Sequence, residues 1–157
     1  MLKIFRDVGL ALAGLGVLLA PILLSASAHS ADTLPGPIPA LVTGVVDGDT
    51  IWVKARIWLG QDIAIKVRLK SVDAPEIGNH SRCEAERLKG QEAKALVAAL
   101  VDGRSVNLYG VRQDNYGGRV DARIETDAGA DLGEELLAKG LAVHYRAQKP
   151  WCDGQTQ

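Results

Sequence analysis

The chain has 157 residues, of which 47% are hydrophobic and 24% are charged, and its formal net charge is −1. These values are ordinary for a globular protein and suit a single domain with its own core. They exclude a protein that holds duplex DNA through a general basic surface, so a polyanion would have to be captured by local arginines and a metal.

The N-terminal segment has the organisation of a secretory signal peptide. Lys3 and Arg6 precede an apolar run over residues 8–24, and four small residues follow at 25–28. We expect cleavage after Ala28, which removes two of 18 basic and one of 19 acidic residues and leaves a formal charge of −2. The run approaches the length that spans a bilayer, so an uncleaved membrane anchor is the alternative. Both interpretations predict an exported protein, periplasmic or secreted in the first case and membrane-anchored outside the cytoplasm in the second.

Residues 29–40 are predicted to form a linker, and residues 41–157 the folded domain. Three prolines around a glycine give the linker an extended character. Cys83 and Cys152 are the only cysteines, and after export we expect them to form a disulfide, although two buried free thiols remain the alternative.

The first half of the domain is predicted to be a three-stranded meander. Residues 41–46 form a short strand, Asp47-Gly48 is a hairpin turn, and the return strand runs from Asp49 to about residue 58. A turn at 60–62 leads into an alternating strand at 63–69, with Arg68 on the face opposite the aliphatic row. Pro75 restricts the turn that follows, so Asp73 and Glu76 leave the strand in a defined geometry.

Helical signals follow this meander. Ser81 and Glu84 have the spacing of a capping box, and the helix that they begin ends at Asp102-Gly103. Residues 105–111 and 119–126 predict two more strands, and a short helix is expected at 132–139. Five strands with a helix between the third and the fourth is the order of an OB-type barrel, a mainly β fold with two packed helices.

Four motifs follow one another along the chain. They are Val45-Val46-Asp47-Gly48-Asp49-Thr50, then Val67-Arg68-Leu69 followed by Asp73-Ala74-Pro75-Glu76, then Asp114-Asn115-Tyr116-Gly117-Gly118-Arg119, and finally Gly140-Leu141-Ala142. In this order they resemble the staphylococcal nuclease (thermonuclease) family. The resemblance covers about residues 41–145 and implies a five-stranded OB barrel with packed helices.

The resemblance implies a calcium site. Asp49 and Asp73 match the family's calcium-binding aspartates, and the backbone carbonyl of Ala74 is the expected third oxygen. Calcium prefers hard oxygen ligands of this kind, from carboxylates, carbonyls and water.

The same resemblance implies hydrolysis of phosphodiester bonds in DNA or RNA, leaving 3′-phosphate ends. Glu76 matches the glutamate that positions or deprotonates the attacking water, while Arg68 and Arg119 match the arginines that grip the scissile phosphate. One extra glycine before Arg119 makes its placement the least secure, with Arg123 as the nearest competitor. The expected protein is monomeric, with nucleic acid as its substrate. The alternative function is a non-catalytic OB-type module that binds nucleic acid or protein.

Overall fold

The computed structural model describes residues 33–115 and 117–152. Residues from Ala31 onward form a compact unit of their own. The predicted signal peptide or anchor at 1–28 lies outside the described residues. No helix in the described part of the chain has the length and apolar character needed to cross a membrane.

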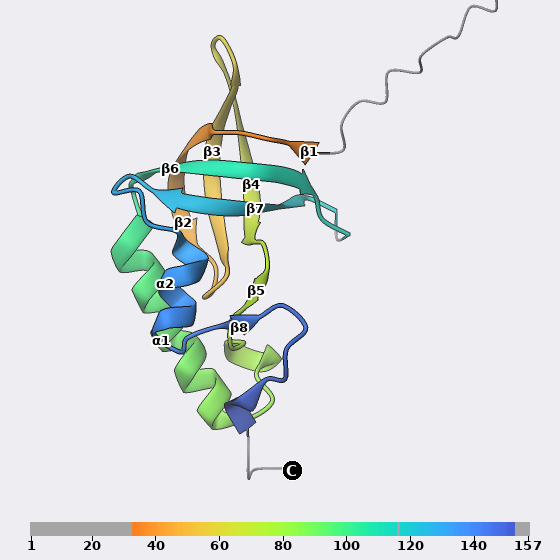
Figure 1. Cartoon of the computed structure of the whole chain (residues 1–157), viewed down its shortest axis with the longest axis vertical. Coiled ribbons are helices and arrows are strands. Elements are labelled where there is room, and N and C mark those ends of the chain that lie inside the picture. Colours follow the sequence, from red (N-terminus) through yellow and green to blue (C-terminus); the bar gives the residue numbers. More distant parts are fainter. Residues whose placement is uncertain (1–32, 116, 153–157) are drawn as a thin grey trace, which may run out of the picture. The chain divides into compact units, whose positions relative to one another are not determined.

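Five strands close into a barrel (Figure 1), which confirms the predicted OB-type architecture. Strands β2, β3 and β4 form an antiparallel meander, β6 pairs with β2, and β7 pairs with β6. A parallel pairing between β4 and β7 closes the barrel. The five strands are β2 (Ile38–Val45), β3 (Thr50–Trp58), β4 (Gln61–Leu69), β6 (Ser105–Gln113) and β7 (Arg119–Thr126).

The core forms because alternate residues of each strand point into the barrel. On β3 the buried row is Ile51, Val53 and Ala55, and on β4 it ends with Val67 and Leu69. Among the described residues, the buried apolar core runs from Ala40 to Trp151.

Helix α1 (Glu84–Val101) packs against the barrel through small and β-branched residues. Its N-cap is Cys83, whose Sγ accepts a hydrogen bond from the Glu86 N–H at 3.4 Å. The predicted capping box is therefore wrong in detail, because the Ser81 hydroxyl donates to the Gly78 carbonyl instead. A disulfide from Cys83 to Cys152 holds this end of the helix, as expected from the sequence.

Helix α2 (Leu132–Ala138) begins as expected, with Asp131 Oδ1 accepting hydrogen bonds from the N–H groups of Gly133 and Glu134. Two single-turn 3-10 helices lie near the start of α1. The first, η1 (Gly78–His80), precedes α1 by a few residues, and the second, η2 (Pro150–Cys152), is joined to the start of α1 by the disulfide.

Part of the predicted linker belongs to the sheet. Strand β1 (Thr33–Leu34) pairs with β6, and β2 begins at Ile38 rather than at residue 41. Proline, which has no N–H to donate, is tolerated at position 39 of β2 because this residue pairs on one side only, with β6. The pairing of β2 with β3 begins one residue later, at Ala40. Two further short strands, β5 (Val72–Asp73) and β8 (Val143–His144), pair beside the barrel.

Candidate active site

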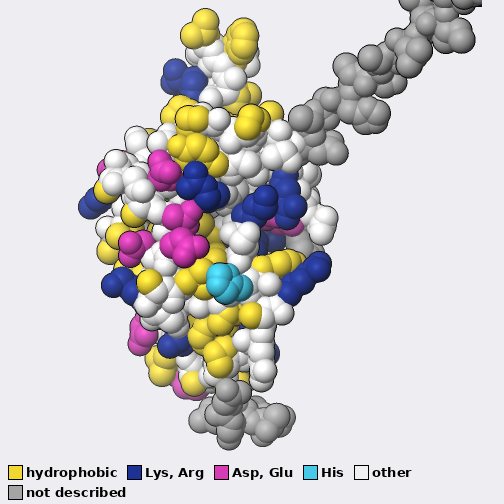
Figure 2. Space-filling model, viewed as in Figure 1, with side chains coloured by type: hydrophobic (Ala, Val, Ile, Leu, Met, Phe, Trp, Pro, Cys, Tyr) yellow, Lys and Arg dark blue, Asp and Glu magenta, His cyan; other side chains and the backbone are white. Residues whose placement is uncertain are grey.

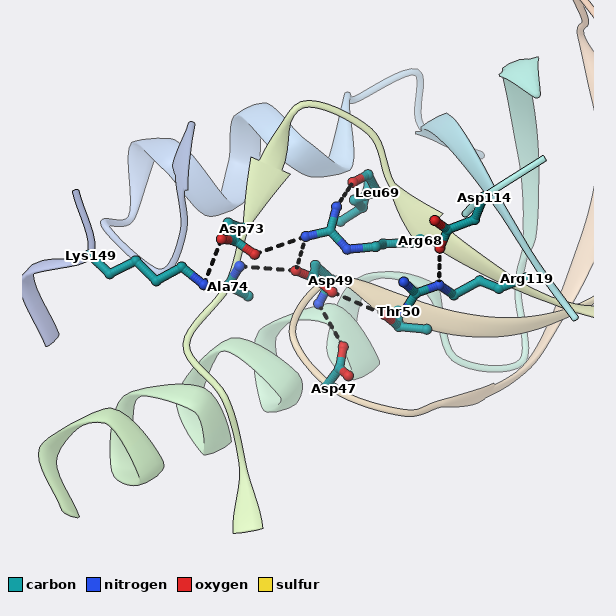
Figure 3. A network of polar contacts seen from close by, with 10 residues as sticks. All are labelled: Asp47, Asp49, Thr50, Arg68, Leu69, Asp73, Ala74, Asp114, Arg119 and Lys149. Carbon is teal, nitrogen blue, oxygen red and sulfur yellow. Dashed lines mark hydrogen bonds and ion pairs between the residues drawn. The ribbon is translucent and has the colours of Figure 1, made fainter. Parts of the chain in front are cut away.

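Two aspartates, one from the turn before β3 and one from β5, meet on one guanidinium group (Figure 3). Arg68 Nη2 donates to Asp49 Oδ2 at 3.2 Å and to Asp73 Oδ1 at 2.8 Å. Arg68 Nη1 also donates to the carbonyl of Leu69 at 3.2 Å, which fixes the orientation of the guanidinium plane. Since both carboxylate oxygens contact the same nitrogen, Asp49 and Asp73 share one small space, as the sequence predicts.

The register of β3 and β4 explains this meeting. Thr50, the first residue of β3, is opposite Arg68, and the N–H of Leu69 donates to the carbonyl of Asp49 at 2.8 Å. Asp49 is held in the preceding turn, where its N–H donates to Asp47 Oδ1 at 3.0 Å. The turn residues and the strand pairing together place the Asp49 side chain at the end of β4.

The second half of the site is a turn that packs closely on the first. The N–H of Ala74 donates to Asp49 Oδ2 at 3.1 Å. Gly48 makes this approach possible, because a Cβ atom at that position would lie 2.8 Å from the Ala74 Cβ and 2.6 Å from the Ala93 Cβ of α1. A side chain at Gly48 would therefore separate the two halves of the site.

Burial dominates the electrostatics of Asp49. The residue is 9% exposed, and loss of solvation raises its pKa from 3.8 to about 6. Arg68 and the hydrogen bonds from Ala74 and Thr50 act in the opposite direction, while the nearby charge of Asp47 adds to the increase. Asp49 is therefore a carboxylate whose negative charge is only partly compensated by the protein.

Glu76 lies in the turn after Asp73 and is half-buried. Loss of solvation and the negative charge of Asp49 raise its pKa above the usual value, whereas the ammonium of Lys149 lowers it. Helix α1 fixes the backbone here, because a Cβ atom at Gly90 would lie 2.6 Å from the Glu76 carbonyl oxygen and 2.7 Å from that of Pro75. A carboxylate with a raised pKa beside two acids is suited to accept a proton.

Arg119 starts β7 beside β4, where it is opposite Lys66 in the parallel ladder. Its Nε donates to the carboxylate of Asp114, which holds the side chain over the barrel end. Arg119 and Arg68 line one polar cavity of about 310 Å³, with Lys70, Arg112, Tyr145 and Arg146 also in its wall. The structure thus brings together Asp49, Asp73 and Arg68 by direct contact, and Arg119 by a shared cavity.

The donor set fits a calcium ion. Two carboxylates with oxygens in one small space are hard anionic ligands, and a bound cation would stabilise the ionised form of Asp49 against the burial that raises its pKa. The structure records the N–H of Ala74 on Asp49. The role of the Ala74 carbonyl as a ligand stays a prediction.

Comparison with known proteins agrees with this geometry. The model of the family described as staphylococcal nuclease homologue matches residues 66–157, more than half of the chain. The chain belongs to the staphylococcal nuclease homologue family. The matched range holds every predicted site residue except Asp49, which lies upstream of it.

Three curated relatives of this family member are 30% to 34% identical to it over the stretches that match. A probable staphylococcal-like nuclease, CAN1, from Oryza sativa subsp. japonica is 34% identical over 96 residues, 58% of this chain and 26% of the relative. Endonuclease YhcR from Bacillus subtilis is 30% identical over 116 residues, 70% of this chain and 9% of the relative. A probable endonuclease, LCL3, from Phaeosphaeria nodorum is 32% identical over 93 residues, 57% of this chain and 30% of the relative. The matched region therefore spans less than a third of each relative.

Sequence reasoning missed several partners in this staphylococcal nuclease homologue. Lys149 Nζ lies 2.6 Å from Asp73 Oδ2, and the hydroxyl of Thr50 donates to Asp49 Oδ1 at 3.0 Å. The Arg68 guanidinium lies 5.5 Å from the ring centre of Tyr145. One signal pointed to Lys149, since it lies three residues before a cysteine that was expected to pair near the start of α1.

Proposed function

We propose that this chain is a calcium-dependent nuclease that hydrolyses phosphodiester bonds of DNA or RNA and leaves 3′-phosphate ends. The observation that carries the proposal is the Asp49–Arg68–Asp73 cluster, which opens beside a cavity lined by Arg68 and Arg119. The printed names of the three relatives, a staphylococcal-like nuclease and two endonucleases, support the same class of activity.

The cavity is suited to a phosphate group. Guanidinium groups bind phosphate through parallel hydrogen bonds and stabilise the charge that accumulates on phosphoryl oxygens during attack. Arg68 already donates hydrogen bonds to two carboxylates, so a bound phosphate would accept hydrogen bonds from the same guanidinium group as Asp49 and Asp73. Arg119 would grip the phosphate from the β7 side of the cavity.

Glu76 is the proposed general base. It would accept a proton from the water that attacks phosphorus, while the bond from phosphorus to the 5′-oxygen breaks and the phosphate stays on the 3′ side. Its raised pKa brings it closer to neutral pH, where a base transfers protons most effectively. Asp49, Asp73 and the carbonyl of Ala74 would hold calcium, which supplies polarisation of a phosphoryl oxygen when bound.

We also propose that the protein acts after export, as a monomer, on nucleic acid outside the cytoplasm. The apolar run at 8–24 and the small residues after it support export, and the disulfide between Cys83 and Cys152 is compatible with an oxidising compartment.

The test uses the protein from His29 onward with single-stranded DNA, in the presence of calcium or of a chelator. We expect cutting only with calcium, and fragments that a polymerase extends only after phosphatase treatment. Glu76→Gln should lower the rate by about 10²–10⁴-fold and Arg68→Ala by at least about 10²-fold. Glu92→Gln, a matched change at an exposed residue of α1, should leave the rate unchanged.

The outcomes separate the alternatives. Equal cutting with chelator would remove the metal from the mechanism, and undiminished cutting by Glu76→Gln would remove the proposed base. Binding of single-stranded DNA without any cutting would favour the non-catalytic OB-type module.

A further inference from the structure

The hairpin of β3 and β4 projects beyond the barrel and ends in three bulky apolar residues. Figure 1 shows the projection, and Figure 2 shows hydrophobic side chains at its end. Ile57 is 51% exposed, Trp58 69% and Leu59 88%. Exposed apolar residues scattered singly are normal, but three in succession at a projecting tip mark an interaction site.

The tip is apolar because the core-facing rows of both strands continue past the barrel. On β3 the inward row Val53 and Ala55 continues to Ile57, and on β4 the same face continues to Ile63, which is opposite Ala55. Val53 and Ala55 are buried, whereas Ile57 and Ile63 are exposed. Packing of this barrel alone does not require apolar residues at these outer positions.

Charges around the tip favour an anionic partner. From residue 54 to residue 64 the hairpin carries two cations, Lys54 and Arg56, and one acid, Asp62. Lys54 and Arg56 both contact Asp62, which leaves a net positive charge beside the apolar tip. Trp58 adds an indole, a side chain enriched where apolar and polar regions of a membrane meet.

The start of the described chain lies on the same side of the barrel as the hairpin. Ala40 is opposite Ala55, so Ile38, two residues earlier, is level with the base of the projecting tip. Along the vertical axis of Figure 1, β1 lies nearer to the tip than α1 does. The described chain therefore begins nearer to the hairpin tip than to α1.

The candidate active site lies at the other end of the same strands. Arg68 lies seven positions after Gln61 at the tip of β4, which is about 23 Å at ~3.3 Å per residue. A tip buried by about 5–10 Å in a lipid surface would leave the cavity of Arg68 and Arg119 open to water.

We propose that the tip of the β3–β4 hairpin, Ile57-Trp58-Leu59, inserts into the surface of an anionic lipid bilayer and holds the domain there with its active site facing away. Apolar side chains enter the boundary between headgroups and acyl chains, while Lys54 and Arg56 lie at the level of anionic headgroups. This inference concerns a surface remote from the catalytic residues and does not depend on their proposed roles.

Residues 31–157, which contain the described core, allow a test without the N-terminal apolar run. The probe is a vesicle of phosphatidylcholine and phosphatidylglycerol in equal amounts, and binding is measured by co-sedimentation. We expect the combined change Ile57→Ser, Trp58→Ser and Leu59→Ser to weaken binding at least about tenfold, because it removes the inserted apolar surface. Leu88→Ser, a matched change at another exposed leucine, should bind as the parent does. Unfolding temperature and DNA cutting without vesicles serve as the controls for folding.

A second measurement locates the tip in the bilayer. Vesicles with brominated acyl chains should quench tryptophan fluorescence, and Trp58→Phe should abolish most of that quenching, whereas Trp52→Phe should retain it. Trp52 is the matched control because it is exposed on the outer face of β3, beside Lys66.

Three results would overturn the proposal. The first is vesicle binding by the triple variant that equals binding by the parent. The second is unchanged quenching in Trp58→Phe. The third is a parent protein that does not bind vesicles but self-associates through the tip. The last result would assign the hairpin to a second copy of the chain.

Discussion

Asp49 offers a prediction that needs no substrate. Its carboxylate is buried beside Asp73 and Asp47, and burial raises its pKa from 3.8 to about 6. The perturbation is Asp49→Asn, which keeps the shape of the side chain and removes its charge. Without metal, the free energy of unfolding of the parent and that of the variant should depend differently on pH.

The direction of the pKa shift of Asp49 decides whether its contribution to stability rises or falls with pH. A carboxyl group whose pKa is higher in the folded state binds its proton more tightly there, so the parent gains stability as pH falls. That contribution is complete below about pH 4 and is lost as pH rises through about 6. A difference of about two units between the pKa of Asp49 in the folded state and in the unfolded state contributes about 3 kcal/mol to the free energy of unfolding. The Asn variant lacks this contribution, so its stability relative to the parent should increase by about 3 kcal/mol between pH 4 and pH 8.

Urea denaturation in the presence of a chelator, from pH 4 to pH 8, measures the difference. Asp127→Asn, at an exposed turn residue, controls for the change in net charge. Parallel pH curves for the parent and Asp49→Asn would refute the reasoning. The same denaturation repeated with calcium tests the metal, because calcium binds the ionised carboxylate and should stabilise the parent more at pH 7 than at pH 5.

Three other changes test the packing and charge around the site. Gly90→Ala should lower the free energy of unfolding by about 1–3 kcal/mol and slow catalysis, because its Cβ would press on the backbone oxygen of Pro75. Gly44→Ala, where the added Cβ meets open space, should lower the free energy of unfolding less in the same assay. Lys149→Met should raise the calcium affinity measured by calorimetry about tenfold, because it frees Asp73; an unchanged affinity would contradict this competition. Reducing the disulfide, which closes a separation of 69 residues, should lower the free energy of unfolding by about 4 kcal/mol, and a loss below 1 kcal/mol would argue against loop entropy.

The sequence by itself determined the barrel. Alternation of apolar residues marked β4, the hairpin turn at Asp47-Gly48 marked the start of β3, and Gly140 marked the end of α2, because strand periodicity and turn chemistry are local properties. Boundaries were less certain where a tertiary contact overrides local preference. Cys83 rather than Ser81 caps α1, since the disulfide fixes its backbone, and β2 starts inside a proline-rich stretch because β6 lies beside it.

The residues of the candidate site were also predicted from sequence, through their motifs, but their contacts were not. Only the register of β3 against β4 decides that Arg68 bridges Asp49 and Asp73, and only the return of the chain at Lys149 places an ammonium on Asp73. The exposed tip of the hairpin is likewise a tertiary fact, because alternating apolar residues look the same in sequence whether or not a barrel covers them. Local patterns report which faces are apolar, whereas the distances between segments depend on packing that no single segment encodes.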